Sequence, residues 1–134
     1  MTTFGKEYFR PLEFTPEQIR KYLQSTLRDL EIARKDLFPE VRFSFAYQSL
    51  IKAGITLLAK KGGVRVRSIP GHHVKILQNM SELLQDKDIL TIGDVMRTKR
   101  NYDFYSAGGL ITEKEADDYL EFVEGVIHKV KGVM

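Results

Sequence analysis

The sequence contains no cysteine, and this absence narrows the classes of protein that it can belong to. A chain without thiols forms neither disulfides nor thiolate-rich metal sites. The absence is typical of proteins that act in the cytoplasm, and we expect this location here.

Long apolar runs are also scarce. The first twelve residues mix charges with aromatics and hold no apolar stretch that could serve as a signal peptide. The most apolar stretch is 43–59, but Gln48 and Lys52 lie in its middle, and each is costly to place in hydrocarbon. We therefore expect a buried helix at 43–59 and no membrane segment.

Several familiar chemical motifs are missing as well. The chain has no glycine-rich phosphate loop, no nucleophile elbow and no pair of catalytic carboxylates on a shared face. The adjacent His72 and His73 form a poor zinc site, because neighbouring side chains on a helix point about 100° apart. No cysteine or nearby carboxylate completes a ligand set. We expect neither a metal nor a cofactor.

The composition is that of one compact globular domain spanning residues 1–134. Hydrophobic residues make up 43% of the chain and charged residues 29%, and the net charge is +3. The charge is unevenly spread. Residues 60–75 hold five lysines and arginines and no acid, whereas residues 113–124 hold six acids against one lysine. The basic segment favours anionic partners, and the acidic segment repels them.

Apolar residues recur with a helical period along almost the whole chain, which predicts an all-α fold. Short connections between the helices predict an up-and-down bundle of four to five antiparallel helices. After an N-terminal arm at 1–14, whose aromatics we expect to pack on the bundle or on a dimer mate, the expected helices span about 16–37, 40–60, 70–85, 90–105 and 112–131.

Local details refine this prediction. Thr15 with Gln18, and Thr112 with Glu115, have the spacing of capping boxes at helix starts. Residues 64–69 alternate valine and arginine, but no partner strand is visible in the sequence, so we expect an ordered loop. The second helix carries small residues that would let another helix approach closely: Ala46, Ser49, Ala53 and Gly54.

The densest polar stretch of the chain lies at 97–105. On a helix, Arg97, Asn101 and Tyr105 form one gently winding stripe, with Arg100 beside it. Guanidinium groups suit bidentate phosphate binding, and tyrosine can stack on a base. An alternative stays open, in which these cations are only the solvated end of a helix, where they complement the helix dipole.

A second candidate site precedes the third helix. Arg65 and Arg67, followed by Pro-Gly and by His72 and His73, could form an anion pocket with the amides at the helix start. Here too a structural interpretation stays open, in which Pro and Gly mark a turn, one histidine packs inside and the arginines face water.

The hexapeptide Arg-Asn-Tyr-Asp-Phe-Tyr at 100–105 resembles the motif of HEPN (higher eukaryotes and prokaryotes nucleotide-binding) domains. That motif is typically an arginine and a histidine separated by four positions, the first of which is often polar. Here Asn101 fits, and Tyr105 stands at the histidine position. An Arg-Asn-x-x-x-Tyr variant is typical of a bacterial and archaeal branch. The chain also resembles that branch in the Tyr-Gln-Ser of its second helix, at 47–49, and in the Arg-Val-Arg-x-x-x-Gly-x-His pattern at 65–73 that leads into the third helix. The likeness covers about residues 43–127.

The resemblance implies a bundle that dimerises, with motif residues of both protomers meeting in a basic cleft. Many HEPN proteins cut RNA without metal, often as toxins paired with a nucleotidyltransferase, and others bind nucleotides without cutting. By position, Arg100 would hold the scissile phosphate, Asn101 would orient it, and Tyr105 would occupy the acid/base position. Tyrosine, with a pKa of about 10, is a poorer base at neutral pH than histidine. His72 or His73 could compensate, so whether the chain is a metal-independent ribonuclease stays open.

Two other functions are compatible with the sequence. In one, the chain is a non-catalytic dimeric module that binds a nucleotidyltransferase or another enzyme through the small-residue face of its second helix or through its acidic last helix. In the other it is an all-α structural domain, since a fold does not determine a function.

Overall fold

Five α-helices and one small sheet make up the described part of the chain. A computed structural model describes the backbone of residues 7–105 and 111–134, and the side chains of residues 7–101 and 111–134. In chain order the elements are β1 (Phe9–Pro11), α1 (Pro16–Lys35), α2 (Pro39–Leu57), the π-helical turn η1 (Leu58–Gly62), β2 (Val64–Val66), α3 (His72–Leu83), α4 (Lys87–Tyr105) and α5 (Glu113–Val133).

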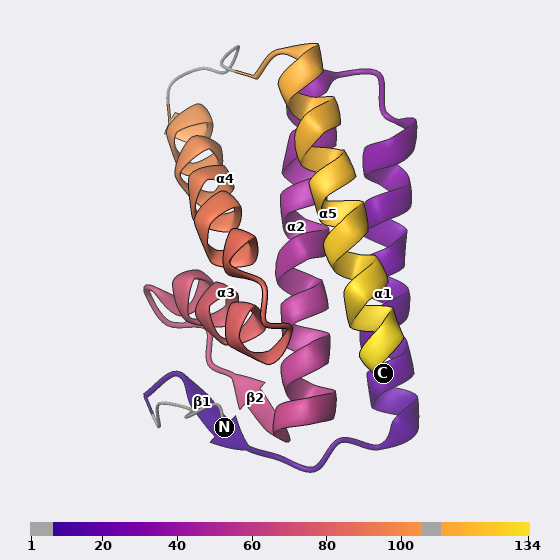
Figure 1. The fold of residues 1–134 in the computed structure, drawn as a ribbon, viewed down its shortest axis with the longest axis vertical. Coiled ribbons are helices and arrows are strands. Elements are labelled where there is room, and N and C mark those ends of the chain that lie inside the picture. The colour runs from indigo at the N-terminus through magenta and orange to yellow at the C-terminus, as the bar shows by residue number, and fades with distance from the viewer. Residues whose placement is uncertain (1–6, 106–110) are drawn as a thin grey trace.

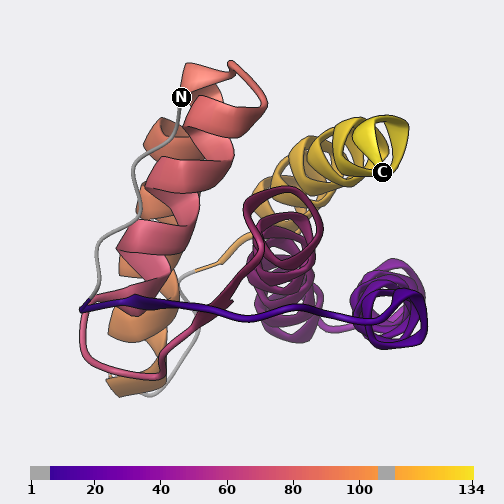
Figure 2. The same cartoon turned by 90° about the horizontal axis from the view of Figure 1, so that it is seen from below.

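The long helices form an up-and-down bundle, as the sequence predicts (Figure 1). Helices α1 and α4 run in one direction, and α2 and α5 run in the other, so that α2 and α5 lie side by side with the same polarity. The shorter α3 lies across the bundle beside α4, which the view along the long helices makes plain (Figure 2). Within the described residues, no helix combines the length and the apolar character that crossing a bilayer requires.

Both predicted capping boxes are present. The Gln18 amide N–H donates to Thr15 Oγ1 over 3.1 Å, and the Thr15 N–H donates to Gln18 Oε1 over 2.8 Å. The same reciprocal pair joins Thr112 and Glu115 at the start of α5. These bonds satisfy amides that would otherwise lack an intrahelical partner, and they explain why α1 and α5 begin within one residue of the predicted positions.

Helix α2 lies at the centre of the fold and packs against its neighbours with almost no intervening side-chain volume. A Cβ atom on Gly54 would lie 2.4 Å from Cγ2 of Ile76 and 2.5 Å from Sδ of Met80, so α3 packs directly on the α2 backbone. The four small residues singled out in the sequence are all buried inside the chain: Ala46, Ser49, Ala53 and Gly54. The expectation that their face could receive a partner protein is therefore wrong, because other helices of the same chain cover it.

The predicted loop at 64–69 is also partly wrong, since its first residues form β2. Strand β2 pairs antiparallel with β1, and Phe9 lies opposite Val66. Two further backbone bonds extend the pairing, from Arg67 N–H to the Tyr8 carbonyl at 2.7 Å and from Leu12 N–H to the Gly63 carbonyl at 2.9 Å. The partner strand comes from the N-terminal arm, more than fifty positions away, so the local pattern could not indicate it. Of the arm's aromatics, Phe9 is buried in the core, Phe14 packs edge-on against Tyr22 of α1, and Phe4 lies outside the described residues.

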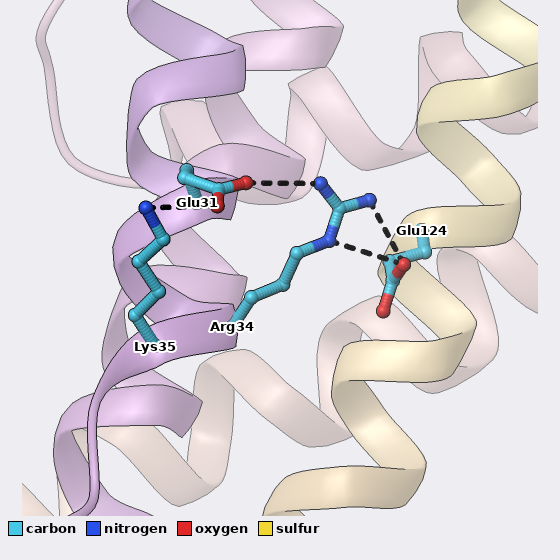
Figure 3. Close-up of polar contacts among 4 residues, drawn as sticks. All are labelled: Glu31, Arg34, Lys35 and Glu124. Carbon is cyan, nitrogen blue, oxygen red and sulfur yellow. Dashed lines mark hydrogen bonds and ion pairs between the residues drawn. The ribbon is translucent and has the colours of Figure 1, made fainter.

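An ion-pair network ties α1 to α5 on the outside of the bundle (Figure 3). Arg34 of α1 donates through Nε and Nη2 to one carboxylate oxygen of Glu124, over 3.3 and 2.9 Å. Its Nη1 reaches Glu31, which also pairs with Lys35. Hydrogen bonds from Arg34 and then from Lys35 hold the pKa of Glu31 below its ordinary value. Glu124, one of the acids of α5, therefore forms an ion pair within the chain.

A partly buried polar cluster joins α1 to α2. Lys52 Nζ donates to Ser25 Oγ over 2.9 Å and lies 2.7 Å from Oδ2 of Asp29, a carboxylate that is almost fully buried. Beside it, Thr56 and Thr26 each donate to a carbonyl one turn earlier in their own helix. The Lys52 ammonium is paired with the carboxylate, and we therefore interpret this cluster as a structural tie between the two helices.

Candidate functional site

The two segments singled out in the sequence meet at one open pocket. Residues 68–74, which lead into α3, form one wall, and Arg97 and Asn101 of α4 form the other. The pocket has a volume of about 320 Å³. Arg97 and Asn101 are one helical turn apart and therefore lie on the same side of α4. The fold thus brings together His72, His73, Arg97 and Asn101, which the sequence placed in two separate candidate sites.

The turn into α3 depends on a glycine. Gly71 has a φ of 86°, in the left-handed region that favours glycine over other residues. A Cβ at this position would also lie 3.2 Å from the Tyr8 hydroxyl of the N-terminal arm. Gly71 is the N-cap of α3, and glycine has no side chain that could accept a hydrogen bond from the amides of the first helical turn. These first-turn amides belong to residues that line the pocket.

The adjacent histidines make different contacts. His72 Nδ1 lies 2.7 Å from the Ile69 carbonyl oxygen, in the turn that precedes α3. His73 Nδ1 lies 2.9 Å from the hydroxyl of Tyr47, a fully buried residue of α2. The two imidazole rings meet edge to face, with centroids 4.3 Å apart. One histidine is therefore tied to its own turn, and the other is tied to the core of the bundle.

Tyr47 links the pocket to the motif arginine. The Arg100 guanidinium lies over the Tyr47 ring, 5.5 Å from its centroid, in cation–π geometry. Burial raises the pKa of the Tyr47 phenol above its ordinary value, and the nearby positive charges of Arg100 and Arg97 oppose that rise. Tyr47 therefore stays protonated, touching His73 with its hydroxyl and Arg100 with its ring.

Burial is the main reason that the pKa of His73 falls to about 4. The neighbouring charges of His72 and Arg100 act in the same direction, because each disfavours a second cation nearby. His73 is consequently neutral at pH 7. A neutral ring that hydrogen-bonds Tyr47 suits a structural role, in which His73 fixes the start of α3 against α2.

The remaining predicted site residues lie in different places. Arg97 is held by Asp94, one turn earlier on α4, through a bond of 2.8 Å from Nε to Oδ1. Arg67 donates to the Glu7 carbonyl over 2.8 Å, and this contact anchors the N-terminal arm. Arg65 is exposed on β2 opposite Arg10, and neither Arg65 nor Arg67 lines the pocket. The backbone of Tyr105 ends α4, and its side chain lies outside the described part of the chain.

Two participants were not identified as site residues from the sequence. Tyr47 was part of a resemblance only, although a hydroxyl in an otherwise buried helix indicates a polar partner nearby. The Ile69 carbonyl carries no sequence signal at all, since every residue has one. Among the described residues, no group of three or more histidines and carboxylates is placed to hold a metal ion.

Comparison with known proteins identifies no relative of this chain. No family model matches the chain, and we found no significant similarity to a curated protein or to a solved structure.

Proposed function

We propose that the chain is a HEPN-like RNA-binding protein whose site is the pocket between the start of α3 and the C-terminal half of α4. The observation that carries this proposal is the convergence of His72 and His73 with Arg97 and Asn101 around one pocket. The motif arginine, Arg100, is held against the bundle next to it.

The chemistry of the pocket suits a phosphodiester. A guanidinium offers planar paired donors that match two phosphate oxygens, and an asparagine amide adds a neutral donor. The basic segment 60–75 leads into the pocket and contributes long-range attraction for a polyanion. RNA presents both the phosphate and a 2′-hydroxyl beside it, and it is the substrate that the HEPN resemblance implies.

Metal-independent RNA cleavage is the reaction that we propose for this site. Arg100 stabilises the extra negative charge that develops on the phosphoryl oxygens, and Asn101 orients the phosphate. The toxin role, the homodimer, the nucleotidyltransferase partner and the cytoplasmic location stay predictions of the resemblance and of the composition.

The alternative function, a non-catalytic module that binds a nucleotidyltransferase or another enzyme, also stays a prediction. Of the two surfaces considered for it, the small-residue face of α2 is buried. Several acids of α5 already pair within the chain, among them Asp117 with Arg42, and Glu124 with Arg34. These pairs reduce the free negative charge on that helix, so RNA binding accounts better for the described surface.

Fluorescence anisotropy with a labelled single-stranded RNA of mixed sequence tests the proposal. Binding should weaken with added salt, because neutralised phosphates release counterions. The variants R97A and R100A should each lower the salt slope by about 1. R28A removes an exposed arginine of α1, on the other side of the bundle, and serves as the charge-matched control. The absence of RNA binding, or equal losses in R28A and R97A, would refute the proposal.

A further inference from the structure

The two histidines of the pocket differ in what their ring nitrogens can do. The Ile69 carbonyl can only accept a hydrogen bond, so Nδ1 of His72 must carry the proton in the 2.7 Å contact between them. The neutral imidazole has one proton, and the lone pair therefore lies on Nε2. Among the residues that the structure describes, none donates a hydrogen bond to this atom.

The carbonyl that orients His72 is itself well fixed. It accepts hydrogen bonds from the backbone N–H of His72, over 3.1 Å, and from the ring N–H of the same residue. One oxygen therefore fixes both the backbone and the side chain of His72. The Ile69 N–H in turn donates to the Arg67 carbonyl over 3.0 Å, next to the β1–β2 sheet. A base whose second nitrogen is oriented by a fixed acceptor has the arrangement that proton transfer requires.

His73 does not offer the same chemistry. Its Nδ1 is engaged by the Tyr47 hydroxyl. Its pKa of about 4, lowered first by burial, makes it a weak base at neutral pH. Its contacts place it as a positioning residue, which links Tyr47, and through it Arg100, to the start of α3.

We propose that His72 Nε2 is the general base of RNA cleavage in this pocket, which rests on the proposed function. His72 takes the proton from the 2′-hydroxyl, and the freed oxygen attacks the adjacent phosphorus. A bond forms between O2′ and phosphorus, and the bond from phosphorus to the 5′-oxygen breaks. The leaving oxygen takes a proton from water, and the hydroxide that remains takes the proton from His72, which restores both the water and the neutral base. The products are a 2′,3′-cyclic phosphate and a 5′-hydroxyl end, and no other reactant is consumed.

The assignment explains how a chain with tyrosine at the usual histidine position could still cleave RNA. Arg97 and Asn101 line the same pocket as His72, so a phosphate bound by them there would lie near a base from another helix. The base is thus supplied by α3, while the phosphate-binding groups are supplied by α4.

The test measures cleavage and binding of a labelled single-stranded RNA, in EDTA, by the full chain and its variants. H72N keeps an amide that can donate to the Ile69 carbonyl but has no basic nitrogen, and H72Q is measured beside it in case H72N does not fold. H128N alters an exposed histidine of α5 and is the matched control. An oligonucleotide of the same sequence with 2′-deoxyribose at every position lacks the attacking hydroxyl and is the substrate control.

We expect H72N and H72Q to cleave about 100-fold more slowly or worse, with RNA affinity close to that of the wild type. H128N should behave like the wild type, and the 2′-deoxy substrate should stay intact. Cleavage by both His72 variants near the wild-type rate overturns the assignment, as does a loss fully explained by weaker binding. Wild-type protein that binds RNA without cleaving it also overturns the assignment but leaves RNA binding standing, whereas wild-type protein that does not bind refutes the proposed function itself.

Discussion

Acidification should destabilise the folded chain through His73. The pKa of His73 is about 4 in the folded chain and 6.5 in its ordinary state, because burial and the nearby charges of His72, Arg97 and Arg100 disfavour the cation. The unfolded chain therefore binds this proton more readily than the folded chain does. Stability should be fully present well above pH 6.5 and should be lost progressively as the pH falls toward 4.

The size of the effect follows from this difference. Between about pH 7 and about pH 5, linkage gives a loss of at most about 2 kcal/mol in the free energy of unfolding. His73 keeps part of its surface in water, which screens its neighbours and stabilises the cation, so we expect about 1 kcal/mol. Over this range most carboxylates stay ionised in both states, and they add little to the change.

Urea denaturation followed by circular dichroism at both pH values measures the loss. The variant H73N removes the titrating ring but keeps an oxygen that can accept from the Tyr47 hydroxyl, so its stability should depend less on pH by about 1 kcal/mol. H128N, altered at an exposed histidine of α5, should retain the wild-type dependence. If H73N loses as much stability as the wild type over the same range, the reasoning about burial of His73 is refuted.

Three further substitutions test the packing of the fold by urea denaturation. G54A places a methyl group 2.4 Å from Ile76 Cγ2, and it should lower the free energy of unfolding by about 1–3 kcal/mol despite the better helix propensity of alanine. An unchanged denaturation midpoint would contradict the close packing of α3 on α2. R34A removes the bonds to Glu124 and should cost less than about 1 kcal/mol, and a loss that does not shrink in high salt would argue against an ion pair. F9A empties a buried site and should cost about 3 kcal/mol or more, whereas wild-type stability would show that β1 is not part of the core.

Much of the helical architecture could be predicted because its determinants are local. Capping boxes join residues three positions apart, and the start of α5 at Glu113 follows directly from Thr112 and Glu115. The apolar stripe of α5 is likewise visible in the sequence and is largely buried in the structure. The strand at 64–66 was missed because its partner, at 9–11, is distant in the chain and too short to be recognised alone.

The candidate site shows the same division. The residues Arg100, His72 and His73 could be selected from the sequence, because charge density, a Pro-Gly turn and a motif resemblance are local features. Their roles could not be assigned in this way, since the two histidines are identical in type and adjacent in position. What separates them is a carbonyl three residues back for His72 and a tyrosine twenty-six residues back for His73.

The sequence by itself determined the helices, their capped starts and the basic residues that we propose as phosphate ligands. These features depend on side-chain chemistry and on hydrogen bonds within one turn of chain. Only the tertiary structure decided that α3 and α4 share a pocket and that Arg100 lies on the ring of Tyr47. It also decided that His73 bonds to the core, whereas none of the described residues donates to Nε2 of His72. Those relations depend on how helices pack, and packing joins residues that the sequence keeps far apart.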